Sequence, residues 1–357
     1  MSRFFSARHA SLTPYTPGEQ PRDMRYTKLN TNESPLPPSG AVYEAVAMET
    51  ERLNLYCDPA CTRLRAEAAR LYGVGPDNLL PVNGSDEILS FAFQAFGDET
   101  HPFAFPDITY GFYPVYAALH HVPAHIIPLR EDFTVDPADY RGLHENIVLA
   151  NPNAPTGIAL PPDAIEEIVR TNPDSVVVID EAYIDFGGVS CVPLIEKYDN
   201  LLVTQTFSKS RSLAGARLGF GIACRDLIND LNTIKYSTNP YNVNRMTQAA
   251  GTAACLSNGY YMKNCLIIRE NRAYTTEALR ALGFEVLPSQ ANFILARSAD
   301  IPGRELYESL KARGVLVRWF DQDRIRDFTR ITVGTRAQMD ILLGAVRAIL
   351  TERGVAI

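Results

Sequence analysis

The sequence predicts an α/β protein with a large domain built on a mainly parallel central sheet and a smaller α+β domain. Two observations carry this prediction. From about residue 40, short apolar runs alternate with segments of helical period, as in sheets whose strands are joined by helices. The apolar runs also lack polar alternation. Residues 176–179, for example, are four β-branched residues in succession, which is typical of a strand covered on both faces.

The elements of the expected large domain follow in order along the chain. Helices are expected at 60–72, where Gly73 supplies a C-cap, and at 85–96, where residues 83–87 supply a start signal. Residues 242–282 predict two long helices interrupted near 257–259. The apolar runs predict strands at 102–105, 125–129, 146–150, 175–179 and 201–204.

The last part of the chain changes in pattern. Strands are expected at 284–287, 292–295, 315–318 and 329–333, with helices at 302–313 and 336–352. We therefore expect a small carboxy-terminal domain at 276–357 and a large domain at 39–275. The proline-rich first 38 residues predict an arm that belongs to the small domain and covers the substrate.

Composition narrows the class of protein. The chain has 357 residues and a net charge of −7, which gives no support to nucleic-acid binding. No run approaches the ~18 apolar residues of a membrane helix, and the first residues lack the apolar stretch of a secretory signal. We expect a cytoplasmic protein with no membrane partner. The six cysteines are scattered, and neither Cys57–Cys61 nor the histidines complete a metal-site pattern, so no metal is expected.

Three of the expected strands end in polar residues. Asp180 follows the strand at 175–179, Lys209 follows the strand at 201–204, and the polar turn 151–157 follows the strand at 146–150. Taken singly, they have ordinary interpretations: a cap, a solvated lysine and a loop. Because ligands collect at the carboxyl ends of parallel strands, the three together predict a binding site at that edge of the sheet.

The order and spacing of Asp180, Lys209 and the segment 212–217 resemble the fold-type I (class I and II) aminotransferases, from about Tyr15 to Arg330. Within that family, Leu12-Thr13-Pro14-Tyr15 and the segments 29–35 and 330–335 are most similar to the histidinol-phosphate aminotransferases. The resemblance implies pyridoxal 5′-phosphate as the cofactor. It also implies that Lys209 holds the cofactor as an imine and later moves a proton, and that Asp180 keeps the pyridine nitrogen protonated.

The other cofactor contacts are expected on several segments. Gly84 and Ser85 at a helix start offer N–H groups and a hydroxyl to the phosphate, although plain N-capping also explains them. The resemblance adds further residues and implies their roles: Ser208 and Arg217 complete the phosphate cradle, Asp86 adjoins it, Tyr110 stacks on the pyridine ring, and Tyr183 bonds the 3′-oxygen.

The sequence departs from the family pattern at two places. The family usually has asparagine immediately before Pro-Thr-Gly, bonding the 3′-oxygen, whereas this chain has Ala154 there. We expect Asn153, one position earlier, to reach instead. Tyr56 matches a tyrosine that reaches the cofactor phosphate of a second subunit, but Cys57 follows it in place of the usual proline. The match implies a homodimer with two shared active sites.

The substrate side is expected on the small domain and the arm. Arg330 matches the family position that grips the carboxylate or phosphate of the substrate, as a guanidinium fork does well. Arg318, Tyr15 and Tyr241 match further positions on the phosphate side. For Arg318, a surface ion pair is an equally good interpretation.

The resemblance implies a reversible, ping-pong transfer of an amino group between L-histidinol phosphate and 2-oxoglutarate, a step of histidine biosynthesis. Two alternatives share the scaffold: an aromatic amino-acid aminotransferase, and a threonine-phosphate decarboxylase of cobalamin synthesis. Fold alone does not separate them. A cofactor-binding regulator is a third alternative, but the chain has no room for a DNA-binding domain ahead of residue 40.

Overall fold

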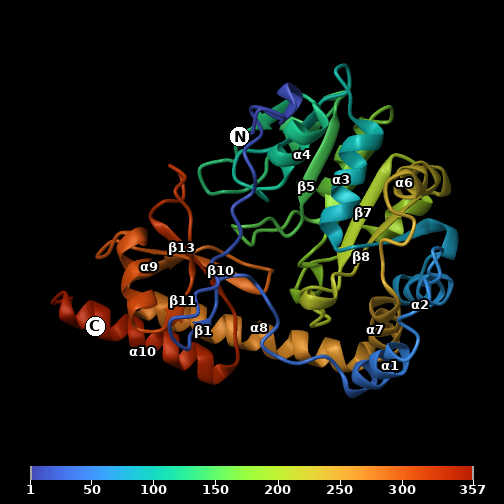
Figure 1. Cartoon of the computed structure of the whole chain (residues 1–357). Helices are drawn as coiled ribbons and strands as arrows, with labels where there is room; N and C mark the ends of the chain where they lie inside the picture. The colour runs from blue at the N-terminus through green and yellow to red at the C-terminus, as the bar shows by residue number, and fades with distance from the viewer. Residues whose placement is uncertain (1, 356–357) are drawn as a thin grey trace.

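The computed structural model describes residues 2–355 and contains a large sheet, a smaller sheet and an isolated strand pair (Figure 1). The large sheet has seven strands in the order β2-β8-β7-β6-β5-β3-β4. Within it, β8 alone runs antiparallel to its neighbours, which confirms the predicted mainly parallel sheet. The strands are β2 (Leu79–Val82), β3 (Phe103–Pro106), β4 (Ala124–Ile127), β5 (Asn146–Ala150), β6 (Val177–Asp180), β7 (Leu201–Thr206) and β8 (Gly219–Ala223).

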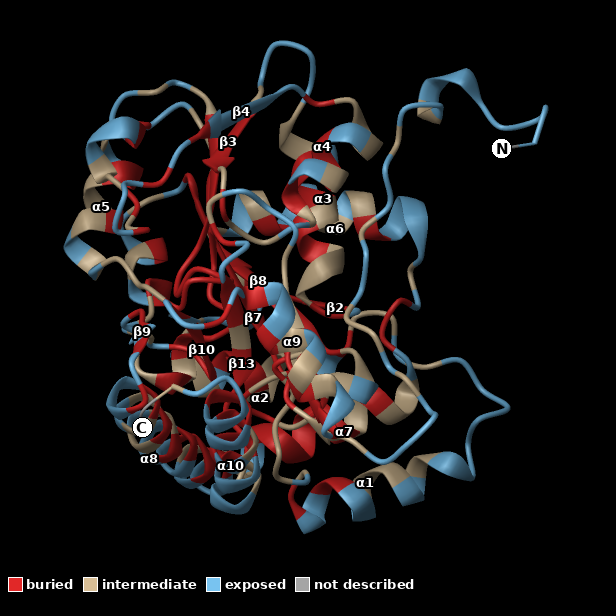
Figure 2. Ribbon diagram, turned by 90° about the vertical axis from the view of Figure 1, so that its left-hand side faces the viewer, coloured by how far each residue is buried: buried red, intermediate tan, exposed pale blue. Residues whose placement is uncertain are grey.

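Helices cover both faces of this sheet. Figure 2 shows α5 on one side of the strands and α3, α4 and α6 on the other. Every residue of β5, β6 and β7 is buried, as expected for strands covered on both faces. The helices of this part are α1 (Gly40–Thr50), α2 (Thr62–Tyr72), α3 (Ser85–Phe96), α4 (Tyr113–His120), α5 (Pro162–Thr171), α6 (Arg225–Thr238) and α7 (Arg245–Leu256).

The smaller sheet is antiparallel, with four strands in the order β12-β13-β10-β9. Its strands are β9 (Phe284–Val286), β10 (Phe293–Ser298), β12 (Arg318–Trp319) and β13 (Phe328–Thr332), and it packs with α9 (Gly303–Ala312) and α10 (Arg336–Glu352). The long helix α8 (Asn258–Ala281) runs beneath both parts in Figure 1. The arm joins the small part because β1 (Thr27–Lys28) pairs in parallel with β11 (Val315–Leu316).

Most predicted elements are confirmed, and three keep their bounds: the helices at 85–96 and 336–352 and the strand at 146–150. The predicted strand at 315–318 needs correction, because it divides at Val317 into β11 and β12, which belong to different sheets. The predicted domain boundary at residue 275 lies inside α8 and stays a prediction.

Several elements were not predicted. Among the strands and α-helices, they are β1, β2, β8, α1, α4, α5 and α6. Pro81 interrupts the pattern of β2, and two glycines weaken that of β8. The exposed face of α1 carries Tyr43 and Met48, so the helix lacks a clear polar side.

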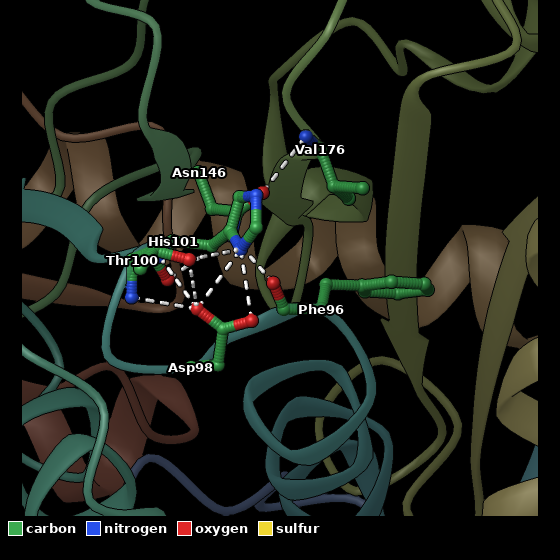
Figure 3. Close-up of polar contacts among 6 residues, drawn as sticks. All are labelled: Phe96, Asp98, Thr100, His101, Asn146 and Val176. Carbon is green, nitrogen blue, oxygen red and sulfur yellow. Dashed lines mark hydrogen bonds and ion pairs between the residues drawn. The ribbon is translucent and has the colours of Figure 1, made fainter.

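A polar network ties the strands together at their amino ends, the edge opposite the polar strand ends predicted above (Figure 3). The Asn146 amide donates to the Phe96 carbonyl at 2.8 Å and accepts from the Val176 N–H at 3.0 Å. In the neighbouring turn, the Asp98 carboxylate accepts from the Thr100 N–H at 2.7 Å and contacts the His101 ring. The polar groups of this network all bond to one another, so its role is to stabilise the fold. Within residues 2–355, no helix is apolar enough over sufficient length to cross a membrane.

Candidate active site

A cavity opens at the carboxyl edge of the large sheet, where the sequence predicts a binding site. Five strands deliver residues to it: segments after β2, β3, β5, β6 and β7 all line its wall. The lining residues are Ser85, Asp86, Tyr110, Ala150, Ala154, Asp180, Ala182, Tyr183, Thr206, Ser208, Lys209 and Arg217. The structure therefore brings together eight of the fifteen residues singled out from the sequence, and a ninth, Gly84, directly precedes Ser85 at the start of α3.

Lys209 lies at the centre of this wall, in the turn that follows β7. Its Nζ donates to the Thr31 carbonyl of the arm at 3.2 Å and lies 5.8 Å from the centre of the Tyr183 ring. The amine thus faces the cavity between the large sheet and the arm, where it is accessible to a ligand.

Asp180 ends β6 deep in the cavity and is 4% exposed. Its carboxylate accepts from Tyr113 OH at 3.1 Å, from Thr204 Oγ1 at 3.1 Å and from the Ala182 N–H at 3.2 Å. Burial raises the pKa of Asp180 to about 6, although these hydrogen bonds oppose the shift. Since burial outweighs these three hydrogen bonds, a cationic group of a ligand beside Asp180 would stabilise its charged form.

An anion cradle forms where α3 begins. Arg217 donates to Asp86 Oδ2 at 2.8 Å and to Ser208 Oγ at 3.4 Å. Tyr110 OH donates to Asp86 Oδ1 at 2.6 Å, and burial followed by the Asp86 charge raises the pKa of Tyr110 well above its usual range. Gly84 has φ of 75°, and a Cβ there would lie 2.4 Å from an Arg217 nitrogen. Only glycine lets the guanidinium approach the helix start.

A second, outer cleft continues from this cavity and shares Tyr110, Ala154, Tyr183 and Lys209 with it. Its far side consists of residues of the arm and of the small sheet, including Tyr15, Arg318 and Arg330.

Both arginines of the outer cleft lie against one aromatic ring. Each guanidinium carbon is 5.4 Å from the centre of the Phe320 ring. Arg330 donates to the Asn30 carbonyl at 3.0 Å, and its buried Nε has no hydrogen-bond partner among residues 2–355. Arg318 donates to the carbonyls of Thr16 and Pro17 at 3.0 and 3.2 Å. Tyr15 stacks on Phe112 with ring centres 4.2 Å apart. Two cations therefore face the space in front of Lys209.

Comparison with known proteins fits this arrangement. Residues 25–346 match the family Aminotransferase class I and II. The chain belongs to this family. Histidinol-phosphate aminotransferase from Brachyspira hyodysenteriae is 47% identical over 352 residues, covering 98% of this chain and 99% of that protein. Histidinol-phosphate aminotransferase 1 from Bradyrhizobium diazoefficiens is 48% identical over 350 residues, covering 98% and 100%.

Solved structures share the aminotransferase fold. Histidinol-phosphate aminotransferase from Sinorhizobium meliloti, in complex with pyridoxal-5′-phosphate, superposes with a TM-score of 0.84 at 23% identity over 92% of each chain. A mutant of Thermus thermophilus aspartate aminotransferase gives a TM-score of 0.83 at 20% identity over 98% of this chain and 100% of that one. At these identities the likeness shows the fold alone.

Three residues predicted for the site lie apart from both cavities of this aminotransferase. The Asn153 amide is occupied by its own loop, donating to the Ile108 carbonyl at 2.9 Å and accepting from Thr109 at 2.8 Å. Tyr56 is 80% exposed and stacks on Tyr241 with ring centres 4.6 Å apart. The structure therefore does not bring these side chains to Lys209 of the same chain.

Other residues near the site escaped the sequence analysis. Thr204 and Tyr113 hold the Asp180 carboxylate, and Phe320 lies between the two arginines. Asn32 in the arm contacts Tyr183. The position of Thr204 directly opposite Asp180 in the sheet follows from strand register, which could have indicated it. For Asn32 and Phe320 no local pattern pointed to the contact.

Proposed function

We propose that this aminotransferase transfers an amino group reversibly between L-histidinol phosphate and 2-oxoglutarate, as a step of histidine biosynthesis, with pyridoxal 5′-phosphate as its cofactor. The observation that carries the substrate assignment is the pair of arginines, Arg318 and Arg330, in the cleft in front of Lys209. Two guanidinium groups match a phosphate monoester, whereas an apolar aromatic side chain would leave both without a counter-ion.

The inner cavity fits the cofactor. The start of α3, with Ser85, Ser208 and Arg217, offers N–H groups, hydroxyls and a positive charge to a phosphate. Lys209 offers an amine to the aldehyde. Asp180 offers a buried carboxylate to the ring nitrogen, and Tyr110 and Tyr183 offer rings and hydroxyls at the cavity wall. In this arrangement Asp86 orients Arg217 and Tyr110 rather than contacting the phosphate.

When bound, pyridoxal 5′-phosphate supplies an aldehyde that condenses with amines and a ring that takes up the electron pair left on the substrate α-carbon. Asp180 keeps a positive charge on the ring nitrogen, because a carboxylate favours the protonated form of a nearby base. With the cofactor bound and a substrate amine in place of its own, the Lys209 amine would be free to take the proton from the substrate α-carbon as a base and to deliver it as an acid to the former aldehyde carbon of the cofactor, where the amino group then stays. Burial beneath the arm keeps water from competing for that proton.

The outer cleft positions the substrate. We infer that Arg318 and Arg330 bind the phosphate of L-histidinol phosphate and that Arg330 also grips a carboxylate of 2-oxoglutarate, with Tyr15 closing the cleft from the arm. Burial lowers the pKa of Arg330, and the neighbouring Tyr183 and Tyr15 oppose that shift. An anionic group of a ligand would compensate for the water that the buried guanidinium has lost. Substrates with two negative charges should therefore bind most tightly.

We further propose that the active unit is a homodimer in which Tyr56 reaches the cofactor phosphate of the partner and Tyr241 the substrate. An exposed apolar surface around α1 and α7 supports this, because Tyr56, Met48, Leu55 and Leu256 are each more than half exposed. Cytoplasmic location remains a prediction from the sequence. So does the contact of Asn153 with the cofactor, which would require its amide to leave its present partners Ile108, Thr109 and Thr156.

A single-turnover absorbance experiment tests the reaction. Cofactor-loaded protein is mixed with L-histidinol phosphate, phenylalanine or O-phosphothreonine, and the conversion of the aldehyde form of the cofactor to the amine form is followed. We expect fast conversion with L-histidinol phosphate alone, reversed by 2-oxoglutarate. Conversion only with phenylalanine would refute the substrate in favour of an aromatic aminotransferase. Carbon dioxide release from O-phosphothreonine would mean a decarboxylase.

Sedimentation and cofactor affinity test the dimer. We expect a dimer in solution and a several-fold weaker affinity for pyridoxal 5′-phosphate in Tyr56→Phe, because the variant loses one hydrogen bond to the phosphate. A monomer with full activity, or a variant with unchanged affinity, would refute the shared site.

A further inference from the structure

The Tyr183 hydroxyl receives a hydrogen bond from the arm, on the side of the outer cleft. Asn32 Nδ2 donates to Tyr183 OH at 3.1 Å, although the two residues are 151 positions apart. Asn32 belongs to the arm segment that follows β1, is 1% exposed, and has the left-handed φ of 56°. A buried polar side chain in this conformation is held by specific contacts, since the backbone conformation is unfavourable for most residues.

The orientation of the Asn32 amide follows from its other partner, Thr332. The Asn32 N–H donates to Thr332 Oγ1 at 2.9 Å, so the hydroxyl accepts there and its own hydrogen is donated to Asn32 Oδ1 at 3.0 Å. If the amide were flipped, the Thr332 hydroxyl hydrogen would lose its acceptor. The amide nitrogen therefore points to Tyr183. A further bond from Asn292 Nδ2 to the Asn32 carbonyl at 2.9 Å fixes the backbone.

This orientation determines what the phenol can do. Because Tyr183 OH accepts from Asn32, its own hydrogen is free to be donated elsewhere. Among the described residues no acceptor lies within hydrogen-bond distance of that hydrogen, and Tyr183 lines both the inner cavity and the outer cleft beside Lys209. The hydrogen is therefore available to a ligand oxygen in the cavity.

This contact matters because the residue at position 154 of the cavity wall is an alanine. Ala154 lines the same two cavities but has no hydrogen-bonding side chain. The Asn153 amide is committed to Ile108, Thr109 and Thr156. Of Ala154, Asn153 and Tyr183, Tyr183 is thus the residue that still offers a hydrogen to a ligand, and the direction of its O–H depends on Asn32.

We propose that Asn32 is a positioning residue for the reaction: it aims the Tyr183 O–H at the cofactor 3′-oxygen and so takes over the task of the amide that Ala154 lacks. The inference rests on the proposed function, because it requires pyridoxal 5′-phosphate in the inner cavity. A donor to this oxygen stabilises negative charge there. This negative charge has the least compensation once the nitrogen bonded to Lys209 has lost its proton. The donor therefore stabilises the deprotonated form more than the protonated form, and it lowers the pH at which the nitrogen titrates.

The test is a spectrophotometric pH titration of the cofactor-loaded enzyme without substrate. Asn32→Gly removes the donor at a φ that glycine tolerates. Asn32→Asp keeps the shape and the Thr332 contact but replaces the donor with an acceptor, which would draw the phenol hydrogen away from the cavity. We expect the midpoint of the visible absorbance change to rise by about one pH unit in Asn32→Gly and by more in Asn32→Asp. Adding Ala154→Asn to Asn32→Gly should restore the midpoint toward that of the unchanged enzyme.

Asn271→Asp is the matched control. Asn271 is buried like Asn32, and it too donates a hydrogen bond from Nδ2, in this case to the Gly334 carbonyl at 3.0 Å. Unlike Asn32, it lines neither cavity. Its substitution should leave the midpoint unchanged while lowering thermal stability. Equal midpoints in the unchanged enzyme and both Asn32 variants would overturn the inference, as would an equal shift in Asn271→Asp. Absence of a visible band, or its survival in Lys209→Ala, would instead refute the proposed function.

Discussion

Replacing Arg324 should weaken substrate binding although Arg324 lies in neither cavity. Arg324 sits midway between Arg318 and Arg330, in the loop that joins β12 to β13. It connects this loop to the large sheet by donating to Asp107 Oδ2 at 2.8 Å and to the Arg130 carbonyl at 2.7 Å. Its guanidinium also lies 5.4 Å from the centre of the Phe133 ring. We infer that these contacts set the distance between the substrate arginines and the large sheet.

The expected size of the effect on substrate binding follows from how far the ion pair of Arg324 is exposed to solvent. The side chains of Arg324 and Asp107 are 34% and 24% exposed, so the ion pair contributes only up to about 1 kcal/mol. The bond from the charged guanidinium to the carbonyl adds a similar amount. Losing about 1.5 kcal/mol corresponds to roughly a tenfold weaker binding. We expect Arg324→Ala to raise KM for L-histidinol phosphate by about that factor, with a much smaller change in kcat, because the residues around Lys209 are untouched.

Steady-state kinetics at saturating 2-oxoglutarate measure both parameters. Arg326→Ala is the control: Arg326 lies in the same loop, but it is half exposed, and its ion pairs within the described part of the chain are with Asp321 and Asp323 of that loop. It should stay within twofold of the unchanged enzyme. If Arg324→Ala kept its KM while retaining the native melting temperature, or if both variants changed equally, the reasoning would be refuted.

Three further predictions concern the cofactor site and the small part of the protein. Gly84→Ala should weaken pyridoxal 5′-phosphate binding at least tenfold in a fluorescence titration, because the new Cβ would displace Arg217, whereas Gly344→Ala, with open space around it, should not. In the cofactor-free protein, Asp180 has a pKa of about 6, raised from 3.8. The folded state therefore keeps its proton to higher pH than the unfolded state. As the pH rises between those two values, the free energy of unfolding should fall by up to about 1.4 kcal/mol per pH unit. A series of melting temperatures in which Asp180→Asn shows the same dependence on pH would contradict this. Thr335→Ala removes a capping box and should lower the free energy of unfolding by about 1 kcal/mol in urea; an unchanged midpoint would count against the cap.

The parts of the fold that the sequence predicted correctly are those with strong local signals. The helix at 85–96 has a glycine and acidic residues at its start, and the strand at 146–150 is an unbroken apolar run. The strands that escaped prediction are held by their neighbours instead. Pro81 of β2 pairs with Phe220 of the glycine-containing β8, and burial in the sheet rather than residue preference makes both extended.

The candidate site divides in the same way. Asp180 and Lys209 end neighbouring strands of one sheet, so the parallel topology brings them together once the strands are recognised. The position of Arg330 beside them depends on how the small sheet and the arm pack against the large one. That packing arises from contacts across some 300 residues, such as the bond from Arg330 to the Asn30 carbonyl. No periodicity or turn signal encodes such a contact, so only the family resemblance suggested it.

The arm shows how a change in one motif can be balanced far away in sequence. Ala154 removes an amide from the cavity wall, and the residues adjacent in sequence do not supply another, because Asn153 is committed to its loop. The Asn32 amide of the arm bonds the Tyr183 hydroxyl instead and is itself held by Thr332 of β13. Since the arm also contacts Lys209 and Arg330 through Thr31 and Asn30, displacing it would disturb the amine, the phenol and the substrate arginine together. The position of the arm therefore sets the arrangement of these three groups together.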